Sequence, residues 1–544
     1  MAGTSTALDC GLLRQVESLR LSAGGQTSPD QKSKLGQFLT PAPVAVLMAS
    51  MLEHSAREII LLDPGAGVGS LFAAVVSAAA VRQPRLRSIR VTAFELDPSL
   101  IAPLRQTMAA CSALCNATGI RFDGEVREED FLAFAADELD SGLFSKASAP
   151  RFNCAILNPP YRKIHAASKA RRLISQLGVE TSNLYAGFVA ATTTLLEPGG
   201  ELVAITPRSF CNGPYFEPFR KNFLETMSLR RLHVFASRKR AFRDDAVLQE
   251  NIIYHAVKAE ATPDKVRISS SEGPEDDHTT SRRVPFGQVV RPGDKHAFIH
   301  IPADEMGHRA VAAMTQLPSN LGDLAMKVST GRVVDFRARS SLRMAPAPGT
   351  APLLYPCHFA KGDIVWPQAT RKPNAIKIGR ETEALLVPSE PYVLVKRFSS
   401  KEETKRIVAT VFDPNRVLGS QIGFENHLNY FYGINEPLTL RVARGLAVFL
   451  NSTMVDAYFR QFNGHTQVNA SDLRSLRYPN REQLERLGDI VPIPFPDQSH
   501  LDDLVESIIG KAKERANQPH PSQAKNPRGA RRTGRSRPAA RPTK

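Results

Sequence analysis

The tetrapeptide Asn158-Pro159-Pro160-Tyr161 constrains this chain most, because it directly follows the apolar run of residues 152–157. An apolar run that breaks into two prolines is typical of a buried strand whose chain turns sharply outward. The residue before each proline is held extended, so the carbonyls here cannot be absorbed into a helix. We therefore expect an amide side chain, a free carbonyl and an aromatic ring at the C-terminal edge of a parallel sheet, where open α/β sheets bind ligands.

This arrangement suits methylation of an amino group whose lone pair is delocalised into a ring or a carbonyl. The side-chain oxygen of Asn158 and the carbonyl of Pro159 can each accept one N–H of a planar amine, which concentrates the lone pair on nitrogen. Positioning and electrostatics then supply most of the catalysis when a sulfonium methyl group lies in line. Tyr161 can stack on the face of a heterocycle. By itself the tetrapeptide leaves open a proline-kinked strand end with an exposed tyrosine.

A glycine-rich loop follows an earlier predicted strand, residues 59–62. This strand runs into Asp63-Pro64-Gly65-Ala66-Gly67-Val68-Gly69 and then into an alanine-rich helix. Strand, glycine turn and helix form the cradle for a nucleotide-like ligand, because glycines allow close backbone approach to it. The G-x-G-x-G spacing and the acid at the strand end disfavour NAD. They favour S-adenosylmethionine, whose methionine group has no phosphate charge to neutralise.

Acidic residues follow the next two predicted strands. Glu95 comes after the strand of residues 89–94, where a carboxylate is placed to bind both hydroxyls of a ribose. Asp130 and Phe131 follow a strand near residues 124–126, where the acid can accept an adenine amino group and the ring can pack on adenine. Earlier in the chain, Thr40 and Pro41 predict the start of an apolar helix over residues 44–53.

The composition of the chain changes after the predicted strands near residues 230–236 and 251–257. A basic loop between them, residues 239–245, carries Phe242, which can stack an extruded base or serve as a buried anchor. Residues 258–284 are polar and charged and predict a linker or a long surface loop. Short strands, turns and many prolines follow. Basic and amide side chains interleave with aromatics in residues 328–332, 392–398, 426–432 and 460–469, a composition that suits groove contacts with DNA.

The length of the chain indicates how many domains it forms, and its charge indicates the kind of partner it binds. A chain of 544 residues predicts two or more domains, because single cores rarely exceed about 250–300 residues. The formal net charge is +16, and residues 511–544 alone hold eleven Lys or Arg and a single Glu. A basic tail on a modestly basic body favours a polyanionic partner, with nucleic acid before membrane. A solubilising tail is the alternative.

Cysteines and histidines indicate no metal site and no disulfide framework. The six cysteines contain no C-x-x-C pair, and the 13 histidines show no metal-ligand spacing. Cys111 and Cys115 lie one helical turn apart and are expected in a core. The N-terminus shows no signal-peptide pattern, and no apolar run reaches membrane-spanning length. These patterns predict that the protein is located in a reducing cytoplasm.

Taken together in their order, the motifs resemble those of the gamma class of adenine-N6 DNA methyltransferases, and most of all the bacterial modification methylases of the PstI type. The resemblance is carried by residues 36–41, 63–69, 95–98, 130–131 and 158–161, and it extends over about residues 32–257. In that family the Gln-Phe-x-Thr-Pro segment precedes the glycine loop and closes over the cofactor. This sequence has Leu39 where an aromatic is frequent, and Pro64-Gly65 in its glycine loop. Neither departure removes a needed group.

The resemblance implies a function for particular residues. It implies that S-adenosylmethionine is bound by Gln37, Thr40, Asp63, Gly65, Gly67, Glu95, Leu96, Asp130 and Phe131. It implies that the target base is held and activated by Asn158, Pro159, Pro160, Tyr161 and Phe242. The expected fold is α/β, a Rossmann-like S-adenosylmethionine-dependent methyltransferase sheet with a C-terminal mixed α/β target-recognition domain.

The expected domains are an N-terminal segment over 1–30, a methyltransferase catalytic domain over 31–260, a DNA target-recognition domain over 285–510 and a basic tail over 518–544. The expected partner is double-stranded DNA in a bacterial cytoplasm, with no membrane. The sequence leaves open whether a cognate restriction endonuclease accompanies the chain. It also leaves open two other functions: a protein-glutamine or RNA amino-group methyltransferase, and a non-catalytic DNA-binding specificity protein.

Overall fold

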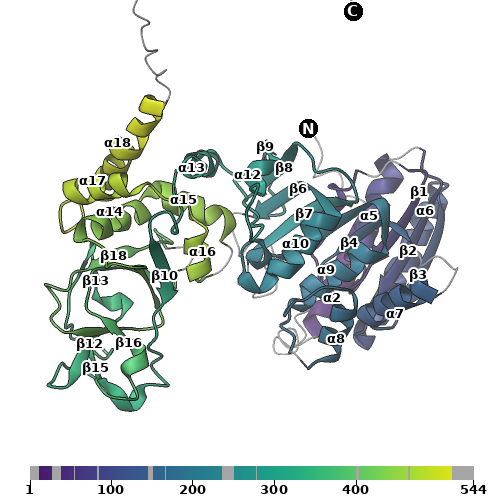
Figure 1. The fold of residues 1–544 in the computed structure, drawn as a ribbon. Coiled ribbons are helices and arrows are strands. Elements are labelled where there is room, and N and C mark those ends of the chain that lie inside the picture. The colour runs from purple at the N-terminus through teal and green to yellow at the C-terminus, as the bar shows by residue number, and fades with distance from the viewer. Residues whose placement is uncertain are drawn as a thin grey trace, which may run out of the picture.

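The computed structural model describes residues 11–26, 38–53, 56–82, 85–144, 151–165, 167–235, 250–276, 279–399, 403–463 and 466–516. These residues form two domains that lie side by side, an N-terminal domain around a nine-stranded sheet and a C-terminal domain of smaller sheets and helices (Figure 1). In these ranges no helix combines the length and the apolar character that a membrane span requires.

The N-terminal sheet has the strand order β3-β2-β1-β4-β5-β7-β6-β8-β9. Its first five strands are parallel, and β7 is antiparallel to both of its neighbours, β5 and β6. This confirms the expected α/β sheet. The strands are β1 Glu58–Asp63, β2 Ser88–Phe94, β3 Arg121–Arg127, β4 Phe152–Leu157, β5 Leu196–Pro207, β6 Met227–Phe235, β7 Asn251–Lys258, β8 Lys265–Ser271 and β9 Thr280–Pro285.

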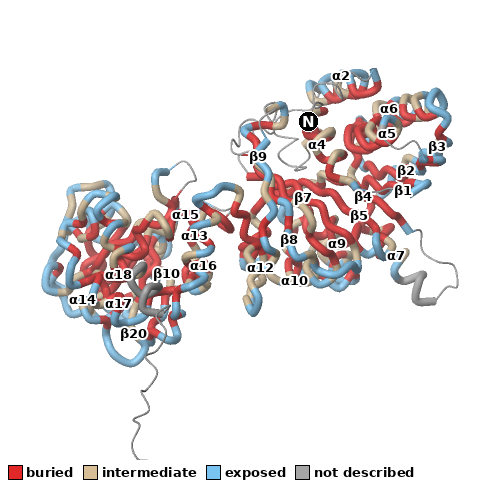
Figure 2. Tube along the Cα trace, turned by 90° about the horizontal axis from the view of Figure 1, so that it is seen from above, coloured by how far each residue is buried: buried red, intermediate tan, exposed pale blue. Residues whose placement is uncertain are grey.

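Helices cover both faces of this sheet, so its central strands are buried on both sides (Figure 2). Strands buried in this way read as continuous apolar runs, as β4 does with all six residues buried. One face is covered by α4 Ala42–Ala49, α5 Ser70–Arg82 and α6 Pro98–Ala117, and α2 Gly11–Gln26 packs over α5 and α6. The other face is covered by α7 Phe131–Phe144, α9 Leu184–Leu195 and α10 Glu217–Thr226, and α8 Lys169–Gln176 packs against α7 and α9. Cys111 and Cys115 are buried in α6, as expected.

The interpretation of residues 258–284 as a linker or surface loop is wrong. Strands β8 and β9 extend the catalytic sheet through a parallel β6–β8 pair and an antiparallel β8–β9 pair. In β8 the apolar residues Val266 and Ile268 alternate with Arg267 and Ser269, which is the period of a half-buried strand. In β9 only Val284 is buried, because an edge strand needs little apolar surface.

The C-terminal domain mixes short strands with helices. Its sheets have the orders β10-β20-β17-β18, β11-β15-β12-β19-β16 and β13-β14. The strands are β10 Met326–Thr330, β11 Leu342–Arg343, β12 Thr350–Leu354, β13 Phe359–Ala360, β14 Asp363–Ile364, β15 Ala375–Lys377, β16 Leu386–Pro388, β17 Tyr392–Lys396, β18 Ala409–Phe412, β19 Gln421–Phe424 and β20 Leu428–Gly433. The helices are α13 Glu305–Thr315, α14 Leu440–Leu450, α15 Thr453–Phe462, α16 Ala470–Arg474, α17 Arg481–Ile490 and α18 Gln498–Ala516. The short helix α12 Phe286–Val289 packs on the catalytic sheet beside β8 and β9 instead.

Arg208 joins the two domains. It lies in the short 3₁₀ helix η1 Arg208–Cys211, directly after β5, and its side chain is buried. Its guanidinium donates to Oε1 of Glu250 at 2.6 Å and to the backbone carbonyls of Arg460 and Gln461 at 2.8 and 2.6 Å. The ion pair with Glu250 lies within the catalytic domain and holds the guanidinium in place. The two hydrogen bonds to the carbonyls cross to the C-terminal domain, and because a hydrogen bond to a charged group contributes about 1.5–3 kcal/mol, they favour this arrangement of the domains.

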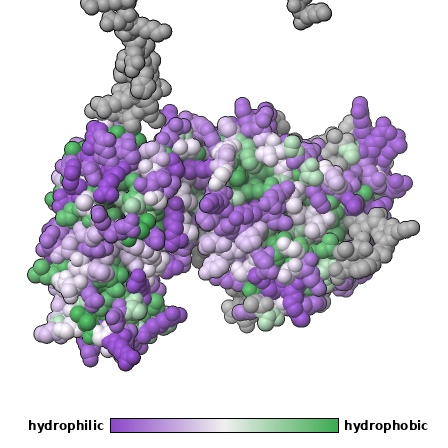
Figure 3. Space-filling model, viewed as in Figure 1, coloured by the Kyte–Doolittle hydropathy of each residue, from purple (hydrophilic) through white to green (hydrophobic). Residues whose placement is uncertain are grey.

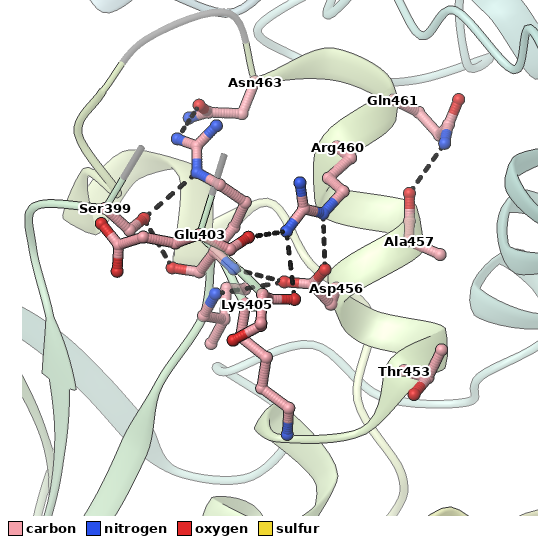
Figure 4. Close-up of polar contacts among 12 residues, drawn as sticks. Ser399, Glu403, Lys405, Thr453, Asp456, Ala457, Arg460, Gln461 and Asn463 are labelled. Carbon is pink, nitrogen blue, oxygen red and sulfur yellow. Dashed lines mark hydrogen bonds and ion pairs between the residues drawn. The ribbon is translucent and has the colours of Figure 1, made fainter. Parts of the chain in front are cut away.

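Helix α15 is itself held firmly at this contact. Arg460 donates to Oδ2 of Asp456 at 2.6 Å and to the Glu403 carbonyl at 2.9 Å, and Gln461 donates to the Ala457 carbonyl at 2.8 Å (Figure 4). Arg460 and Gln461 belong to a stretch that was expected to contact DNA grooves, but their side chains make hydrogen bonds within the protein instead. On the face drawn in Figure 3, hydrophilic residues cover most of both domains and the hydrophobic ones lie in separate areas.

Candidate functional site

A cavity of about 760 Å³ lies at the carboxyl ends of β1, β2, β3 and β4. Its volume is within the range of about 300–1,000 Å³ that small-molecule sites occupy. It is lined by Phe38, Leu39, Thr40, Pro64, Gly65, Ala66, Gly67, Val68, Ser70, Leu71, Phe94, Glu95, Leu96, Asp97, Pro98, Ser99, Glu129, Asp130, Phe131, Leu132, Asn158, Pro160, Arg162, Ala170, Leu184 and Phe188. Motifs that are far apart in the sequence therefore meet at one edge of the sheet.

The glycine loop needs glycine at position 67. Gly67 has a φ of +57°, a conformation that side chains with a Cβ rarely adopt. A Cβ there would also lie 2.8 Å from Cδ2 of Leu39, which covers the loop. At Gly65, in contrast, a Cβ would meet only Phe188 at an ordinary 3.8 Å. Gly65 therefore leaves room in this part of the cavity, and Gly67 shapes the loop.

Glu95 fastens the loop to the end of β2. Its carboxylate accepts the backbone N–H groups of Gly67, Leu96 and Asp97, each at 2.8 Å. Burial raises the pKa of Glu95, and the hydrogen bonds from these three backbone N–H groups oppose that rise. Asp97 in turn accepts the backbone N–H of Ser99 at 2.9 Å and caps α6. The ribose acid expected from sequence thus also positions the backbone around the cavity, a role that the sequence did not reveal.

Asp63 lies beneath the glycine loop and does not line the cavity. Its side chain is fully buried, and neither carboxylate oxygen has a hydrogen-bond partner within the part of the chain that the structure describes. Burial, together with the nearby Glu95 carboxylate, raises its pKa to about 8. The backbone amides of Gly65 and Phe72 oppose this rise in part, although neither is in hydrogen-bonding geometry with the carboxylate. A buried acid without a cation is costly, so a positive ligand group near this loop would stabilise its ionised form.

Asp130 and Phe131 form the wall below β3. Oδ1 of Asp130 accepts the backbone N–H of Leu132 at 3.0 Å. Phe131 is buried, and its ring lies 5.2 Å from that of Phe94 and 5.4 Å from that of Phe188. The wall therefore combines one carboxylate with an aromatic group, which suits a planar base that carries an amino group.

The side chain of Asn158 is oriented by the segment that closes the cavity. Its Nδ2 donates to the backbone carbonyl of Phe38 at 2.9 Å and to Oγ1 of Thr40 at 3.0 Å. Thr40 therefore serves Asn158 rather than the start of α4, whose cap residue is Pro41. With both N–H groups of the amide engaged, Oδ1 is fixed as the acceptor.

Tyr161 stands beside Asn158. Its hydroxyl donates to Oδ1 of Asn158 at 2.8 Å and approaches the carbonyl of Ile205 at 3.3 Å. Its ring lies 5.7 Å from that of Phe38 and, edge-on, 6.2 Å from that of Tyr185. Burial raises the pKa of the Tyr161 hydroxyl well above its ordinary value, so it remains a donor at neutral pH.

The structure brings together most of the residues that the sequence singled out. Thr40, Gly65, Gly67, Glu95, Leu96, Asp130, Phe131, Asn158 and Pro160 line the cavity. Asp63, Pro159 and Tyr161 adjoin it without lining it, and Gln37 and Phe242 lie outside the described residues. Phe38 and Phe188 were missed as site residues. The signal for Phe38 was its place inside the Gln-Phe-x-Thr-Pro segment, and for Phe188 its position one helical turn after Tyr185.

The lining fits S-adenosylmethionine. Glu95, Asp97 and Asp130 present carboxylates, and Phe131 presents a ring, to a ligand whose ammonium, ribose hydroxyls and adenine amine are donors. Arg162 is the one basic side chain in the described lining, so a ligand phosphate would meet mostly acids there. This donor set matches a cationic cofactor without phosphate.

The chain is similar to known methyltransferases over most of its length. Type II methyltransferase M.PstI of Providencia stuartii is 43% identical over 510 residues, which are 94% of this chain and 99% of that protein. Type II methyltransferase M.BsuBI of Bacillus subtilis is 41% identical over 503 residues, 92% of this chain and 98% of that protein. The family model described as Eco57I restriction-modification methylase matches residues 118–242. Among solved structures, the Type IIL restriction-modification enzyme MmeI in complex with DNA has a TM-score of 0.49 and 12% identity, over 92% of this chain and 75% of that one.

Proposed function

This chain belongs to the Type II methyltransferase family of restriction-modification systems, and we propose that it methylates N6 of adenine at one sequence in double-stranded DNA. S-adenosylmethionine is its methyl donor. The observation that most directly supports this proposal is the fixed side-chain amide of Asn158, whose Nδ2 donates to Phe38 and Thr40. Its oxygen is therefore preorganised as an acceptor at the cavity, which is the main requirement for activating a planar amine.

Asn158 and Pro159 supply the activation. The bound cofactor supplies a methyl group on a positively charged sulfur. The Asn158 oxygen and the Pro159 carbonyl each accept one N–H of the target amine, which directs the nitrogen lone pair at the methyl carbon. The cofactor would give up this methyl group to the nitrogen and would leave as the neutral thioether. The target nitrogen would lose one proton to solvent and become a neutral, methylated amino group.

The aromatic residues hold the base. Tyr161 lies beside Asn158 with its ring near that of Phe38, which offers a stacking surface for an extruded ring. We assign a second stacking role to Phe242 on the family resemblance. The proposed partner is duplex DNA in a bacterial cytoplasm. If a cognate restriction endonuclease accompanies this chain, the methylation keeps that nuclease from cutting the DNA of its own host.

Other amines present the same two N–H groups, so the product decides the substrate. The purified protein is incubated with methyl-labelled S-adenosylmethionine and, separately, with duplex DNA, ribosomal RNA and protein extract. Nucleosides and amino acids from each digest are then analysed by mass spectrometry. We expect N6-methyldeoxyadenosine from DNA alone. N4-methyldeoxycytidine would keep the site and refute adenine as the target. Label in RNA or glutamine would refute DNA as the substrate.

A further inference from the structure

Four segments that are far apart in the sequence lie side by side beyond one end of the sheet β10-β20-β17-β18. Backbone hydrogen bonds of 2.7 to 3.0 Å join each segment to its neighbour. In spatial order the segments are residues 331–333, 426–428, 397–399 and 466–468. Each belongs to a stretch with interleaved basic, amide and aromatic side chains, so the fold gathers these stretches on one surface.

Four side chains on this surface form what we call the Arg397 cluster: Arg397, Phe398, His427 and Gln467. The guanidinium carbon of Arg397 lies 5.5 Å from the centre of the Phe398 ring, and the His427 ring lies 4.8 Å from it. Gln467 pairs with Phe398 through an isolated antiparallel bridge. Phe398 is 41% exposed, which is high for a large apolar side chain. The cluster thus shows an aromatic ring to solvent, with the half-buried Arg397 beside it, whose Nε atom is buried.

The cluster is rigid without being covered. The buried carboxylate of Glu425 accepts the backbone N–H of His427 at 2.9 Å and its Nδ1 at 2.5 Å, so the exposed part of the ring offers Nε2. Arg397 donates from Nη1 to the carbonyl of Asn426 at 3.1 Å. Groups fixed in this way lose little conformational entropy on binding, as a recognition surface requires.

The cluster adjoins the side of the C-terminal domain that faces the catalytic domain. In sequence, Gln467 lies between Gln461 and Asp472, two residues that contact the catalytic domain. The carbonyl of Gln461 accepts from Arg208, and the Asp472 side chain accepts from Asn212 at 3.3 Å. Helix α16, which contains Asp472, lies on the side of its domain nearest the catalytic sheet in both views (Figure 1, Figure 2). Arg208 itself directly follows the strand whose Ile205 carbonyl meets the Tyr161 hydroxyl.

We propose that the Arg397 cluster reads base edges of duplex DNA next to the target base, with Arg397 donating to a guanine. This inference rests on the proposed function and adds the residues that select the sequence. A guanidinium fork matches O6 and N7 of guanine, an amide such as Gln467 matches adenine, and an aromatic ring packs on a thymine methyl. Arg332 follows Gly331 of the first segment and Lys396 directly precedes Arg397, so both add positive charge near the cluster, which suits contacts with DNA phosphates.

The test uses the full-length protein and a library of duplexes in which each position around the target is varied. Methylation of every sequence is compared for wild type, Arg397→Ala and Arg397→Lys. The matched control is Arg441→Ala, which removes an exposed arginine of α14 that pairs with Asp489 of α17. Both Arg397 variants are expected to lose on the order of 10- to 100-fold discrimination at one guanine position. Arg397→Lys keeps its affinity for non-cognate DNA because it keeps the charge, and Arg441→Ala keeps the wild-type preference.

Three results would overturn the inference while leaving the proposed function intact. Unchanged discrimination at every position, with unchanged melting temperature, would remove the cluster from base recognition. Equal weakening on all sequences, with a smaller salt slope, would make Arg397 a phosphate contact. A lower melting temperature with unchanged discrimination would make it structural. Failure of the wild type to methylate any duplex would instead refute the proposed function itself.

Discussion

The hydroxyl of Tyr161 donates a 2.8 Å hydrogen bond to the side-chain oxygen of Asn158, the oxygen that the proposed reaction needs as its acceptor. An amide oxygen has two lone pairs, so it can accept from Tyr161 and from one N–H of the target amine together. Tyr161 thus has two separable roles, the alignment of Asn158 through its hydroxyl and the stacking of the base through its ring.

The two roles of Tyr161 predict different losses. Tyr161→Phe is expected to slow methyl transfer by at most about tenfold, because one neutral hydrogen bond contributes about 0.5–1.5 kcal/mol. Tyr161→Ala is expected to weaken base extrusion as well, because stacking is worth about 1–3 kcal/mol per base. Fluorescence of 2-aminopurine at the target position measures extrusion, and single-turnover kinetics measure transfer. Equal losses in both variants would show that the hydroxyl, and not the ring, matters.

Glu95→Ala is expected to weaken S-adenosylmethionine binding by about 1–3 kcal/mol, the cost of losing hydrogen bonds to a charged group. The substitution would remove the carboxylate expected to bind the ribose. It would also remove the hydrogen bonds that hold the backbone N–H groups of Gly67, Leu96 and Asp97 in place. Calorimetric titration measures the affinity. If a folded Glu95→Ala protein bound the cofactor as tightly as wild type, Glu95 would have no part in the site.

Asp63 predicts a pH dependence of stability. Its pKa is raised to about 8 in the folded protein from an ordinary value of 3.8, so the folded state holds a proton that the unfolded state releases. This destabilises the cofactor-free protein progressively as pH rises from about 4 to about 8, and the effect levels off above that. Asp63→Asn lacks this penalty. Its melting temperature should exceed that of wild type by a margin that grows over this range, and a constant margin would contradict the assignment.

The basic tail predicts a salt effect. It lies outside the described residues, and its charge alone motivates the expectation. Deletion of residues 518–544 should lower affinity for non-cognate DNA and flatten the dependence of log K on log salt, because fewer counterions are released. Sequence preference should survive. An unchanged salt slope in a binding titration would leave the tail a solubilising role.

Local motifs made the catalytic domain predictable. Asn158 to Tyr161 and the loop around Gly67 carry their backbone geometry in proline and glycine, so their place at the strand ends followed from sequence. Strand β8 was within reach too, because Val266 and Ile268 alternate with polar residues. Strand β9 was not, because only Val284 of its six residues is buried.

Contacts between distant segments were beyond sequence reasoning. The bond from Asn158 to Thr40 joins residues 118 apart, and that from Arg208 to Gln461 joins residues 253 apart. Neither leaves a periodic or local trace, since a buried arginine reads in sequence like any surface arginine. Glu425 and His427 are close in sequence, but the burial that makes their pair rigid depends on the surrounding sheet.

The most direct test of the account is the single-turnover rate of methyl transfer by Asn158→Ala, with cofactor and cognate duplex both saturating. The matched control is Asn153→Ala. Asn153 lies on β4, the strand that Asn158 follows, and among the described residues its side chain bonds only the backbone of Glu58 and Ile60, so its loss should lower stability and spare the rate. We predict that Asn158→Ala slows transfer by about 10²–10³-fold, as loss of a transition-state hydrogen bond does, while affinity for DNA and cofactor stays near wild type. Adenine methylation by Asn158→Ala at a near wild-type rate would contradict the account.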